Sequence, residues 1–168
     1  MKKNFYIFLD IDGVLNDVAF IKQNSYKGKN ITSELFNPKS VEALNYLIDT
    51  LTAHYETNLV ISSSWRINMD KTLSIMKKNN VRLDNISVSS TKFIVPNKRG
   101  LEILDYLNDK QDINNYVIID DEEFDFKEYF PNSKIIKTNF FYDPLNKEKI
   151  TKFISSLNID TPYKKDLS

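Results

Sequence analysis

Near the start of the chain stands the stretch Phe5-Tyr6-Ile7-Phe8-Leu9-Asp10-Ile11-Asp12-Gly13-Val14-Leu15-Asn16. Its first five residues form a continuous apolar run, which is typical of a strand buried on both faces of a parallel sheet. Two carboxylates follow the run, and Gly13 provides a flexible turn behind them. In open α/β sheets, ligands bind outside the carboxyl ends of the strands. The stretch therefore predicts an α/β fold with a candidate reaction centre where this first strand ends.

The spacing of the two carboxylates suits a catalytic or metal site as well as an ordinary turn. Asp10 and Asp12 leave the strand one residue apart, so both side chains and the carbonyl of Ile11 or Asp12 can converge on one small volume. Mg²⁺ prefers such oxygen ligands. One carboxylate can attack an electrophile while the other moves protons. A polar exit from strand to turn uses the same residue types, so the motif needs support from the rest of the chain.

Composition predicts a soluble globular protein. The 168 residues are enough for one domain with a core, and the hydrophobic content of 41% and charged content of 27% are ordinary. The net charge of zero excludes a general basic footprint for nucleic acid, so any such binding needs a local patch. The chain has no cysteine, which excludes disulfides, thiolate metal sites and a cysteine nucleophile.

Two features of the sequence concern location. The apolar run after Met1-Lys2-Lys3 is too short for a signal peptide and ends in Asp10. No apolar run approaches the ~20 residues that a membrane span needs. Together with the missing cysteines, these features lead us to expect a cytoplasmic protein without a membrane partner.

A second buried strand is predicted over residues 58–61, and it ends in three hydroxyl side chains, Ser62, Ser63 and Ser64. Hydroxyls and backbone N–H groups at a strand end can bind phosphate oxygens. An ordinary serine turn has the same composition. Of the next two residues, Trp65 suits a packing or rim position, and Arg66 can either clamp a substrate or cap a surface.

A third buried strand is predicted over residues 116–119, and four acids follow it, beginning with Asp120 and Asp121. Crowded carboxylates repel one another unless a cation lies among them. The pattern therefore favours a metal site over an acidic helix N-terminus or a solvated turn. Residues 86–88 predict a short strand, and residues 134–138 predict a weaker one at an edge of the sheet.

Helical patterns separate the predicted strands. Asn37 and Pro38 suit the N-cap and first position of a helix, and an apolar stripe follows them as far as Leu51. A second helix is predicted over residues 69–79. Asp143 and Pro144 predict the start of a last amphipathic helix, whose stripe ends at Leu157.

The remaining segments predict the domain organisation. Residues 16–37 show no clear period and predict a loop or a small flap over the strand end, because so short a segment cannot form a domain with its own core. We expect one domain over residues 1–160 and a tail over residues 161–168.

Two cations, Lys98 and Arg99, stand where a helix over residues 98–107 is predicted to begin. The helix dipole favours anions at this end, so the cations conflict with local preference and suggest a function elsewhere. A fixed cation beside a nucleophile would hold a phosphoryl group and offset its developing charge. Two solvent-exposed basic residues are the alternative.

Taken together, the motifs resemble those of haloacid dehalogenase-like (HAD) hydrolases. The resemblance is closer to a small capless branch, the HAD domain of Swiss Army Knife RNA repair proteins, and it rests on residues 8–16, 59–66, 99–103 and 116–122. It implies a three-layer, Rossmann-like, doubly wound parallel sheet with a minimal cap.

The same resemblance implies Mg²⁺-dependent hydrolysis of phosphate monoesters through an aspartyl-phosphate. Asp10 would be the nucleophile and Asp12 the general acid and base. The phosphoryl oxygens would bind Ser63, with Ser62 and Ser64 as alternates, and a cation, with Arg99 preferred over Lys98. The metal would bind a set of four carboxylates, Asp10, Asp12, Asp120 and Asp121.

One segment departs from the family pattern. Such domains carry Thr-Asp-Pro and then Gly-Leu-Thr before the last helix, whereas Thr138 here is followed by Asn139-Phe140-Phe141-Tyr142-Asp143-Pro144. The three aromatic residues of this segment can stack on a base or pack against the terminal helix, and we expect the packing role.

Three functions remain open from the sequence. The first is a phosphatase for nucleic-acid ends such as a 3′-phosphate, and the second is a phosphatase for small phosphoesters such as nucleotides. The third is a non-catalytic phosphate-binding or regulatory module, which Asp10 and Asp12 disfavour because binding needs no nucleophile. The sequence leaves the oligomeric state open.

Overall fold

Five parallel strands form the central sheet of the computed structural model, which describes residues 2–25, 34–113 and 115–159. In chain order they are β1 (Asn4–Leu9), β2 (Glu56–Ile61), β3 (Ser87–Ser90), β4 (Tyr116–Asp120) and β5 (Ile135–Lys137). Their order across the sheet is β3-β2-β1-β4-β5. The predicted strands are all confirmed, including the weak one, which lies at an edge as β5.

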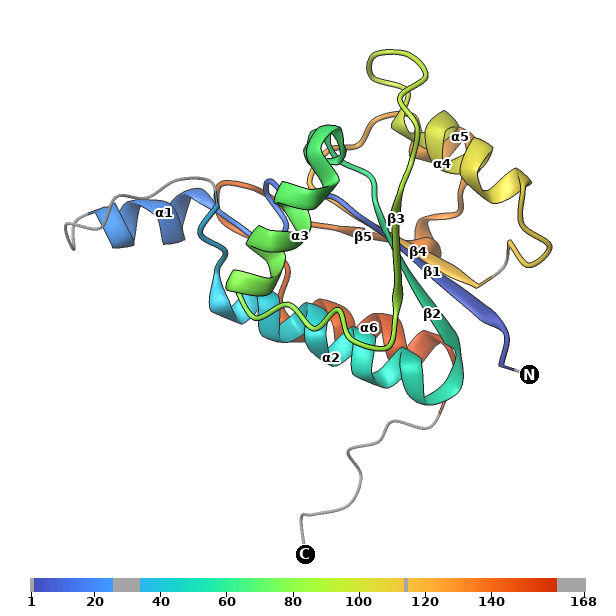
Figure 1. The fold of residues 1–168 in the computed structure, drawn as a ribbon, viewed down its shortest axis with the longest axis horizontal. Coiled ribbons are helices and arrows are strands. Elements are labelled where there is room, and N and C mark those ends of the chain that lie inside the picture. Colours follow the sequence, from blue (N-terminus) through green and yellow to red (C-terminus); the bar gives the residue numbers. More distant parts are fainter. Residues whose placement is uncertain (1, 26–33, 114, 160–168) are drawn as a thin grey trace, which may run out of the picture.

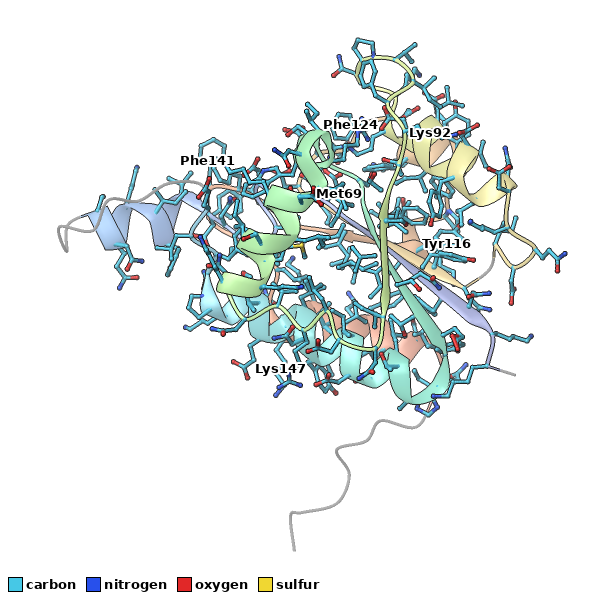
Figure 2. The ribbon with its side chains drawn as sticks, viewed as in Figure 1. Met69, Lys92, Tyr116, Phe124, Phe141 and Lys147 are labelled. Carbon is cyan, nitrogen blue, oxygen red and sulfur yellow. The ribbon has the colours of Figure 1, made fainter. Side chains whose placement is uncertain are left out.

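Helices cover both faces of the sheet (Figure 1). The first layer contains α2 (Pro38–His54), α3 (Met69–Lys78) and α6 (Lys147–Ser156), and the second contains α4 (Arg99–Asn108) and α5 (Phe126–Tyr129). Side chains fill the space between helices and sheet (Figure 2). The predicted three-layer, doubly wound α/β fold is confirmed. In the described part of the chain, none of the helices has the length and apolar character that crossing a membrane requires.

The apolar run of β1 supplies both hydrophobic cores. Successive side chains of a strand point to opposite faces. Phe5, Ile7 and Leu9 therefore pack in the core beneath α2, α3 and α6, while Tyr6 and Phe8 pack in the core beneath α4 and α5. A central strand in a three-layer fold is buried on both faces, which explains why its sequence shows no polar alternation.

The chain reverses its direction of growth between β3 and β4. From β1 it adds β2 and then β3 on one side, and it returns to place β4 on the other side of β1. The carboxyl ends of β1 and β4 are therefore neighbours at a topological switch point, where ligands of open α/β sheets bind.

Two short elements follow strand ends, the 3-10 helices η1 (Ser64–Asn68) and η2 (Asn132–Lys134). The segment predicted as a flap begins with a further helix, α1 (Val18–Ser25), which lies to one side of the two helical layers (Figure 1). Residues 26–33 of this segment and the predicted tail lie outside the described residues.

The start of the last helix was predicted wrongly. Asn146, not Asp143, is the N-cap of α6, and its Oδ1 accepts from the backbone N–H of Lys149 at 3.0 Å. Asp143 is instead paired with Asn139 by two backbone hydrogen bonds of 2.7 and 3.0 Å. The Asp-Pro pair therefore belongs to a turn that precedes the helix.

The packing role expected for the aromatic segment is also wrong for two of its residues. Phe141 is 67% exposed and Tyr142 is 78% exposed. The pairing of Asn139 with Asp143 closes a tight turn around these residues, and their side chains are exposed to solvent there.

Candidate active site

Three carboxylates meet at the switch point of the sheet. Asp10 directly follows β1, Asp120 is the last residue of β4, and Asp121 follows it. The backbone N–H of Asp10 donates to the carbonyl of Ile119 at 3.0 Å, which fixes the two strand ends side by side. One oxygen atom from each of the three carboxylates lies within 4.8 Å of the others. We refer to Asp10, Asp120 and Asp121 as the acid cluster.

Burial makes the acid cluster difficult to ionise without a cation. The pKa of Asp10 is raised well above its usual value by burial and by the nearby Asp120, although Arg99 and a hydrogen bond from the Ser63 hydroxyl oppose this rise. Burial likewise raises the pKa of Asp120 to about 6. The pKa of Asp121 is raised by its burial as well. A bound cation would reverse these shifts because it favours the charged forms.

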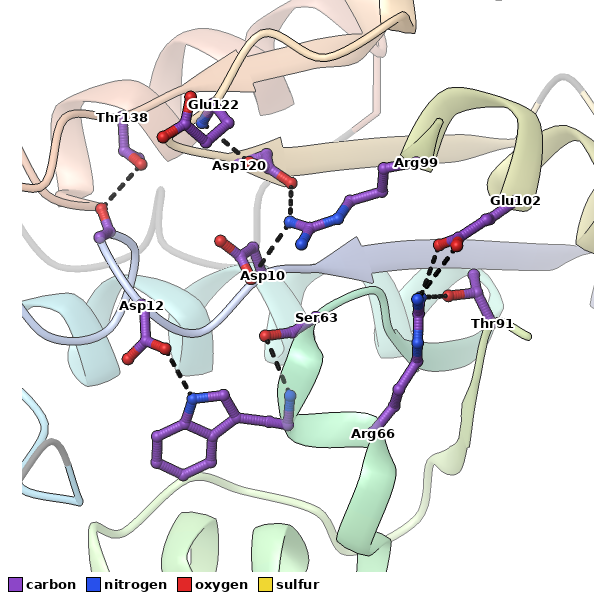
Figure 3. A network of polar contacts seen from close by, with 12 residues as sticks. Asp10, Asp12, Ser63, Arg66, Thr91, Arg99, Glu102, Asp120, Glu122 and Thr138 are labelled. Atoms are coloured by element: carbon purple, nitrogen blue, oxygen red, sulfur yellow. Dashed lines mark hydrogen bonds and ion pairs between the residues drawn. The ribbon is translucent and has the colours of Figure 1, made fainter. Parts of the chain in front are cut away.

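Arg99, the first residue of α4, places its guanidinium beside Asp10 and Asp120 (Figure 3). Its Nη1 lies 2.7 Å from Asp120 Oδ2 and 3.3 Å from Asp10 Oδ1. The Phe124 ring supports the guanidinium from one side, with its centroid 4.4 Å away. The backbone N–H of Glu122 donates to the other oxygen of Asp120 at 2.8 Å, so both oxygens of this buried carboxylate have donors.

Lys98, the second candidate cation, lies apart from the acid cluster. Its Nζ lies 3.4 Å from a carboxylate oxygen of Glu128 and 4.0 Å from one of Asp125. Of the two predicted cations, the structure therefore brings Arg99 to the acids and directs Lys98 toward α5.

Asp125 supplies the negative charge that the helix dipole favours at the start of α4. Its Oδ1 accepts from the backbone N–H of Gly100 at 2.6 Å, and its Oδ2 accepts from that of Leu101 at 3.3 Å. A carboxylate from outside the helix thus satisfies N–H groups of the first turn. A Cβ at position 100 would lie 2.9 Å from Asp125 Oδ1, so glycine permits this close approach.

Asp12 points away from the acid cluster, although it was predicted as a metal ligand. Its Oδ2 accepts from the indole Nε1–H of Trp65 at 2.8 Å, and its Oδ1 accepts from the Asn16 amide at 2.8 Å. These two donors hold the carboxylate on the η1 side of the turn (Figure 3). The carboxylate of Asp12 is therefore positioned as a separate group beside the cluster.

Gly13 allows the turn that separates Asp10 from Asp12. Its φ of +76° lies in the left-handed region, which costs glycine little and other residues more. A Cβ at this position would also lie 2.2 Å from Asp121 Oδ2. The carbonyl of Gly13 accepts from the Thr138 hydroxyl at 2.8 Å, which ties the turn to the end of β5.

The three serines after β2 have different surroundings. Ser63 is buried, its hydroxyl lies near enough to Asp10 to oppose the rise in the pKa of that carboxyl, and its Oγ accepts from the backbone N–H of Trp65 at 3.4 Å. Ser62 is also buried, and within the described structure its Oγ has no hydrogen-bond partner. Ser64 is exposed at the start of η1. Of the three, Ser63 is the hydroxyl that the fold places against the candidate nucleophile.

Arg66 is held in a part-buried ion pair. Its guanidinium donates to both carboxylate oxygens of Glu102, at 2.6 and 3.0 Å, and to the Thr91 hydroxyl at 2.7 Å. Glu102 lies on α4, so the pair joins η1 to that helix (Figure 3). Arg66 therefore contacts a protein carboxylate in this structure, where a substrate contact was predicted.

The acid cluster fits a hard divalent cation. Its three carboxylates supply the oxygen ligands that Mg²⁺ prefers, and their close approach and raised pKa values are those of acids that lack a full counter-charge. Arg99 offsets part of the negative charge but has one guanidinium for three acids. The residues that would hold the ion are Asp10, Asp120 and Asp121.

Three residues of this region were not predicted in their roles. The sequence could have indicated a role for Trp65, because an indole N–H that is removed from solvent needs an acceptor. It could also have indicated one for Glu102, because a carboxylate among the apolar residues of a helix needs a partner. For Asp125 the sequence offers no signal, since its partners lie 24 and 25 residues away. Such pairings depend on how α4 packs beside α5.

Comparison with known families agrees with this geometry. The family model described as the HAD domain in Swiss Army Knife RNA repair proteins matches residues 6–148, which include every residue of the site described above. Searches of curated proteins and of solved structures found no match. HAD domains are phosphatase-type hydrolases that generally use Mg²⁺. The chain therefore belongs to the HAD domain family of Swiss Army Knife RNA repair proteins.

Proposed function

We propose that this protein hydrolyses phosphate monoesters in a Mg²⁺-dependent reaction, with Asp10 as nucleophile and Asp12 as general acid and base. One observation carries the proposal: two carboxylates that leave the same strand end have different partners. Asp10 lies with the acid cluster and Arg99, while Asp12 is held by Trp65 and Asn16. A nucleophile and a proton carrier need separate positions on opposite sides of the reacting bond.

The proposed reaction has two steps. An oxygen of Asp10 attacks phosphorus in line with the leaving oxygen, the phosphorus–oxygen bond of the ester breaks, and Asp12 donates a proton to the leaving oxygen. The product is an aspartyl-phosphate. Asp12, now ionised, takes a proton from water, which attacks phosphorus, releases inorganic phosphate and regenerates Asp10.

Arg99 and Ser63 are the proposed phosphoryl ligands. The Arg99 guanidinium lies 3.3 Å from Asp10 Oδ1, and the Ser63 hydroxyl lies beside the same carboxylate (Figure 3), so both groups are near the place that a phosphoryl group on Asp10 would occupy. Fixed donors of this kind stabilise charge without reorganising. Asp10, Asp120 and Asp121 would hold Mg²⁺, which supplies positive charge to the phosphoryl oxygens when it is bound.

The proposed substrate is a phosphate at the end of a nucleic acid. This part of the proposal rests on the RNA repair proteins from which the family takes its description. A phosphatase for small phosphoesters is the alternative. Salt separates the two, because contacts to neighbouring phosphates of a polynucleotide weaken steeply as salt rises, whereas a single phosphomonoester depends less on it.

Phosphate release from a generic aryl phosphate and from a 3′-phosphorylated oligonucleotide tests the proposal. We expect wild type to release phosphate with Mg²⁺ and to stop in EDTA, and Asp10→Asn to be inactive under both conditions. Asp105→Asn, which changes an exposed carboxylate of α4, serves as the matched control and should behave as wild type. Equal release by wild type and Asp10→Asn would refute the nucleophile.

A second experiment tests the division of roles. Asp12→Asn cannot take the proton from water, so we expect it to accumulate a phosphorylated enzyme when an aryl phosphate, whose leaving group needs little protonation, is supplied. Mass spectrometry of proteolytic peptides should locate the added phosphate on Asp10. Phosphate on another residue would assign the nucleophile elsewhere.

A further inference from the structure

A cavity of about 370 Å³ lies directly beside the proposed phosphoryl site. Its lining comes from η1, from the loop of residues 91–98 that follows β3, and from the start of α4. Arg99 and Phe124 line it, and the same Arg99 contacts Asp10 and Asp120. A substrate whose phosphate lies at Asp10 therefore has this cavity as the neighbouring space for the group that carries the phosphate.

The cavity is lined in part by apolar side chains that are exposed and do not pack in a hydrophobic core. Ile67 is 89% exposed and Phe93 is 66% exposed, and both line the cavity with Val95 and Pro96. Neither Ile67 nor Phe93 belongs to the two hydrophobic cores. Large apolar side chains that gather at the surface mark binding sites. The exposed ring of Phe93 offers a flat face to a flat ligand.

Basic groups accompany these apolar side chains. The Arg66 guanidinium lies 5.8 Å from the centroid of the Phe93 ring, and Glu102 holds it in place through two hydrogen bonds. Lys98 and Arg99 also line the cavity. Each of these three cations is also paired with a carboxylate: Arg66 with Glu102, Lys98 with Glu128, and Arg99 with Asp120. The exposed Phe93 ring with a guanidinium beside it suits a ligand that carries a flat aromatic group.

We propose that this cavity binds the nucleoside of a nucleoside phosphate, with its base stacked on Phe93 and its phosphate at Asp10. The proposal rests on the proposed phosphatase function and specifies its substrate class. Bases of every kind stack on aromatic side chains and on arginine planes. At about 370 Å³, the cavity is near the lower end of the ~300–1,000 Å³ range of small-molecule sites. The nucleoside phosphate is either a free nucleotide or the end of an oligonucleotide.

The test compares substrates with and without a base. We would measure kcat/KM for a nucleoside 3′-monophosphate, for a 3′-phosphorylated oligonucleotide and for glycerol phosphate, using wild type, Phe93→Ala and Phe93→Tyr. In Phe93→Ala the ratio of kcat/KM on either nucleotide to that on glycerol phosphate should fall about 5- to 150-fold, the effect of losing one base–aromatic stack. Phe93→Tyr keeps the ring and should retain most of the ratio.

Phe141→Ala is the matched control, because Phe141 is equally exposed but does not line the cavity. It should keep the wild-type ratio. A ratio that Phe93→Ala leaves unchanged would overturn the proposal, even if all three activities fell together. Higher kcat/KM on the oligonucleotide than on the mononucleotide would assign the nucleoside to a nucleic-acid end, and the reverse would assign it to a free nucleotide.

Binding separates failure of this proposal from failure of the phosphatase function. If wild type hydrolyses none of the three esters, the proposed activity is wrong, and the cavity is then tested by equilibrium binding of a fluorescent nucleoside monophosphate. Weaker binding by Phe93→Ala than by Phe141→Ala would still support the nucleoside site. Equal dissociation constants for the two variants would refute it.

Discussion

The indole of Trp65 is a positioning group for Asp12, and its removal should slow the chemical step. Trp65→Phe keeps an aromatic ring against Phe36, whose centroid is 5.8 Å from that of Trp65, but it removes the 2.8 Å hydrogen bond to Asp12. Hydrogen bonds to charged groups contribute about 1.5–3 kcal/mol. We expect kcat for phosphate release to fall roughly 10- to 100-fold, with little change in KM.

A double-mutant cycle separates this role from a structural one. If Trp65 acts through Asp12, Trp65→Phe should have little further effect in an Asp12→Asn background. Additive losses in the double variant would show that Trp65 contributes by another route. An unchanged kcat in the single variant would remove Trp65 from the mechanism.

The turn at Gly13 should also be sensitive to a single methyl group. Gly13→Ala places a Cβ against Asp121 and forces alanine into the left-handed region. We expect an apparent Mg²⁺ affinity at least tenfold weaker and a free energy of unfolding lower by about 1–2 kcal/mol. Activity against Mg²⁺ concentration and urea unfolding measure the two effects.

Asn85→Ala is a suitable control for this variant. Asn85 is exposed and has a φ of +63°, so its replacement imposes similar backbone strain without touching the acid cluster. It should lower stability while leaving the Mg²⁺ dependence unchanged. Equal Mg²⁺ dependence in both variants would mean that the contact with Asp121 is unimportant.

Among the elements, α4 links the cap at Asp125 to the position of Arg99. Asp125→Ala leaves the N–H groups of Gly100 and Leu101 without this acceptor, and losing an N-terminal cap costs about 0.5–2 kcal/mol. Because Arg99 is the first residue of the helix, fraying of the first turn should also displace its guanidinium. We therefore expect lower thermal stability together with a several-fold rise in KM.

Removal of the N-cap of α6 serves as the control for removal of the Asp125 contacts at the start of α4. Asn146→Ala removes the hydrogen bond to the backbone N–H of Lys149, and it should cost a similar amount of stability without raising KM. A rise in KM in both variants would indicate a general loss of structure. A rise in Asp125→Ala alone supports the link to Arg99.

The elements show what the sequence could and could not predict. Runs such as 116–119 predicted the buried strands because a central parallel strand must be apolar on both faces. The start of α6 was missed because Asp-Pro and Asn-Lys are both acceptable helix starts, and a bridge between Asn139 and Asp143 decides between them. The partners of Trp65, Arg66 and Asp125 lie 24 or more residues away, and local patterns carry no information on such pairs.

In the whole molecule, the strand order accounts for the site. The acids of β1 and β4 are 110 residues apart in the chain (120 − 10) and meet because the chain returns to the other side of β1 after β3. The same order places the serines after β2 on the opposite side of Asp10 from Asp120. Asp10 therefore lies between a hydroxyl group and a carboxylate group, the two ligand types that a phosphoryl group and a cation require.

The acid cluster should make the stability of the metal-free protein depend on pH. Burial raises the pKa of Asp120 to about 6 in the folded state, whereas an unfolded Asp titrates near 3.9. Between these values the folded state binds more protons than the unfolded state, so the free energy of unfolding falls as pH rises. The slope is up to about 1.4 kcal/mol per pH unit for each such carboxyl.

Urea unfolding in EDTA between pH 4 and pH 7 measures this effect. We expect the free energy of unfolding to fall more steeply with rising pH in wild type than in Asp120→Asn, while Asp105→Asn keeps the wild-type slope. At pH 7, millimolar Mg²⁺ should raise the stability of wild type, because an ion that binds the folded state alone stabilises it by mass action. Parallel pH curves for wild type and Asp120→Asn, or no stabilisation by Mg²⁺, would show that the cluster does not carry uncompensated negative charge.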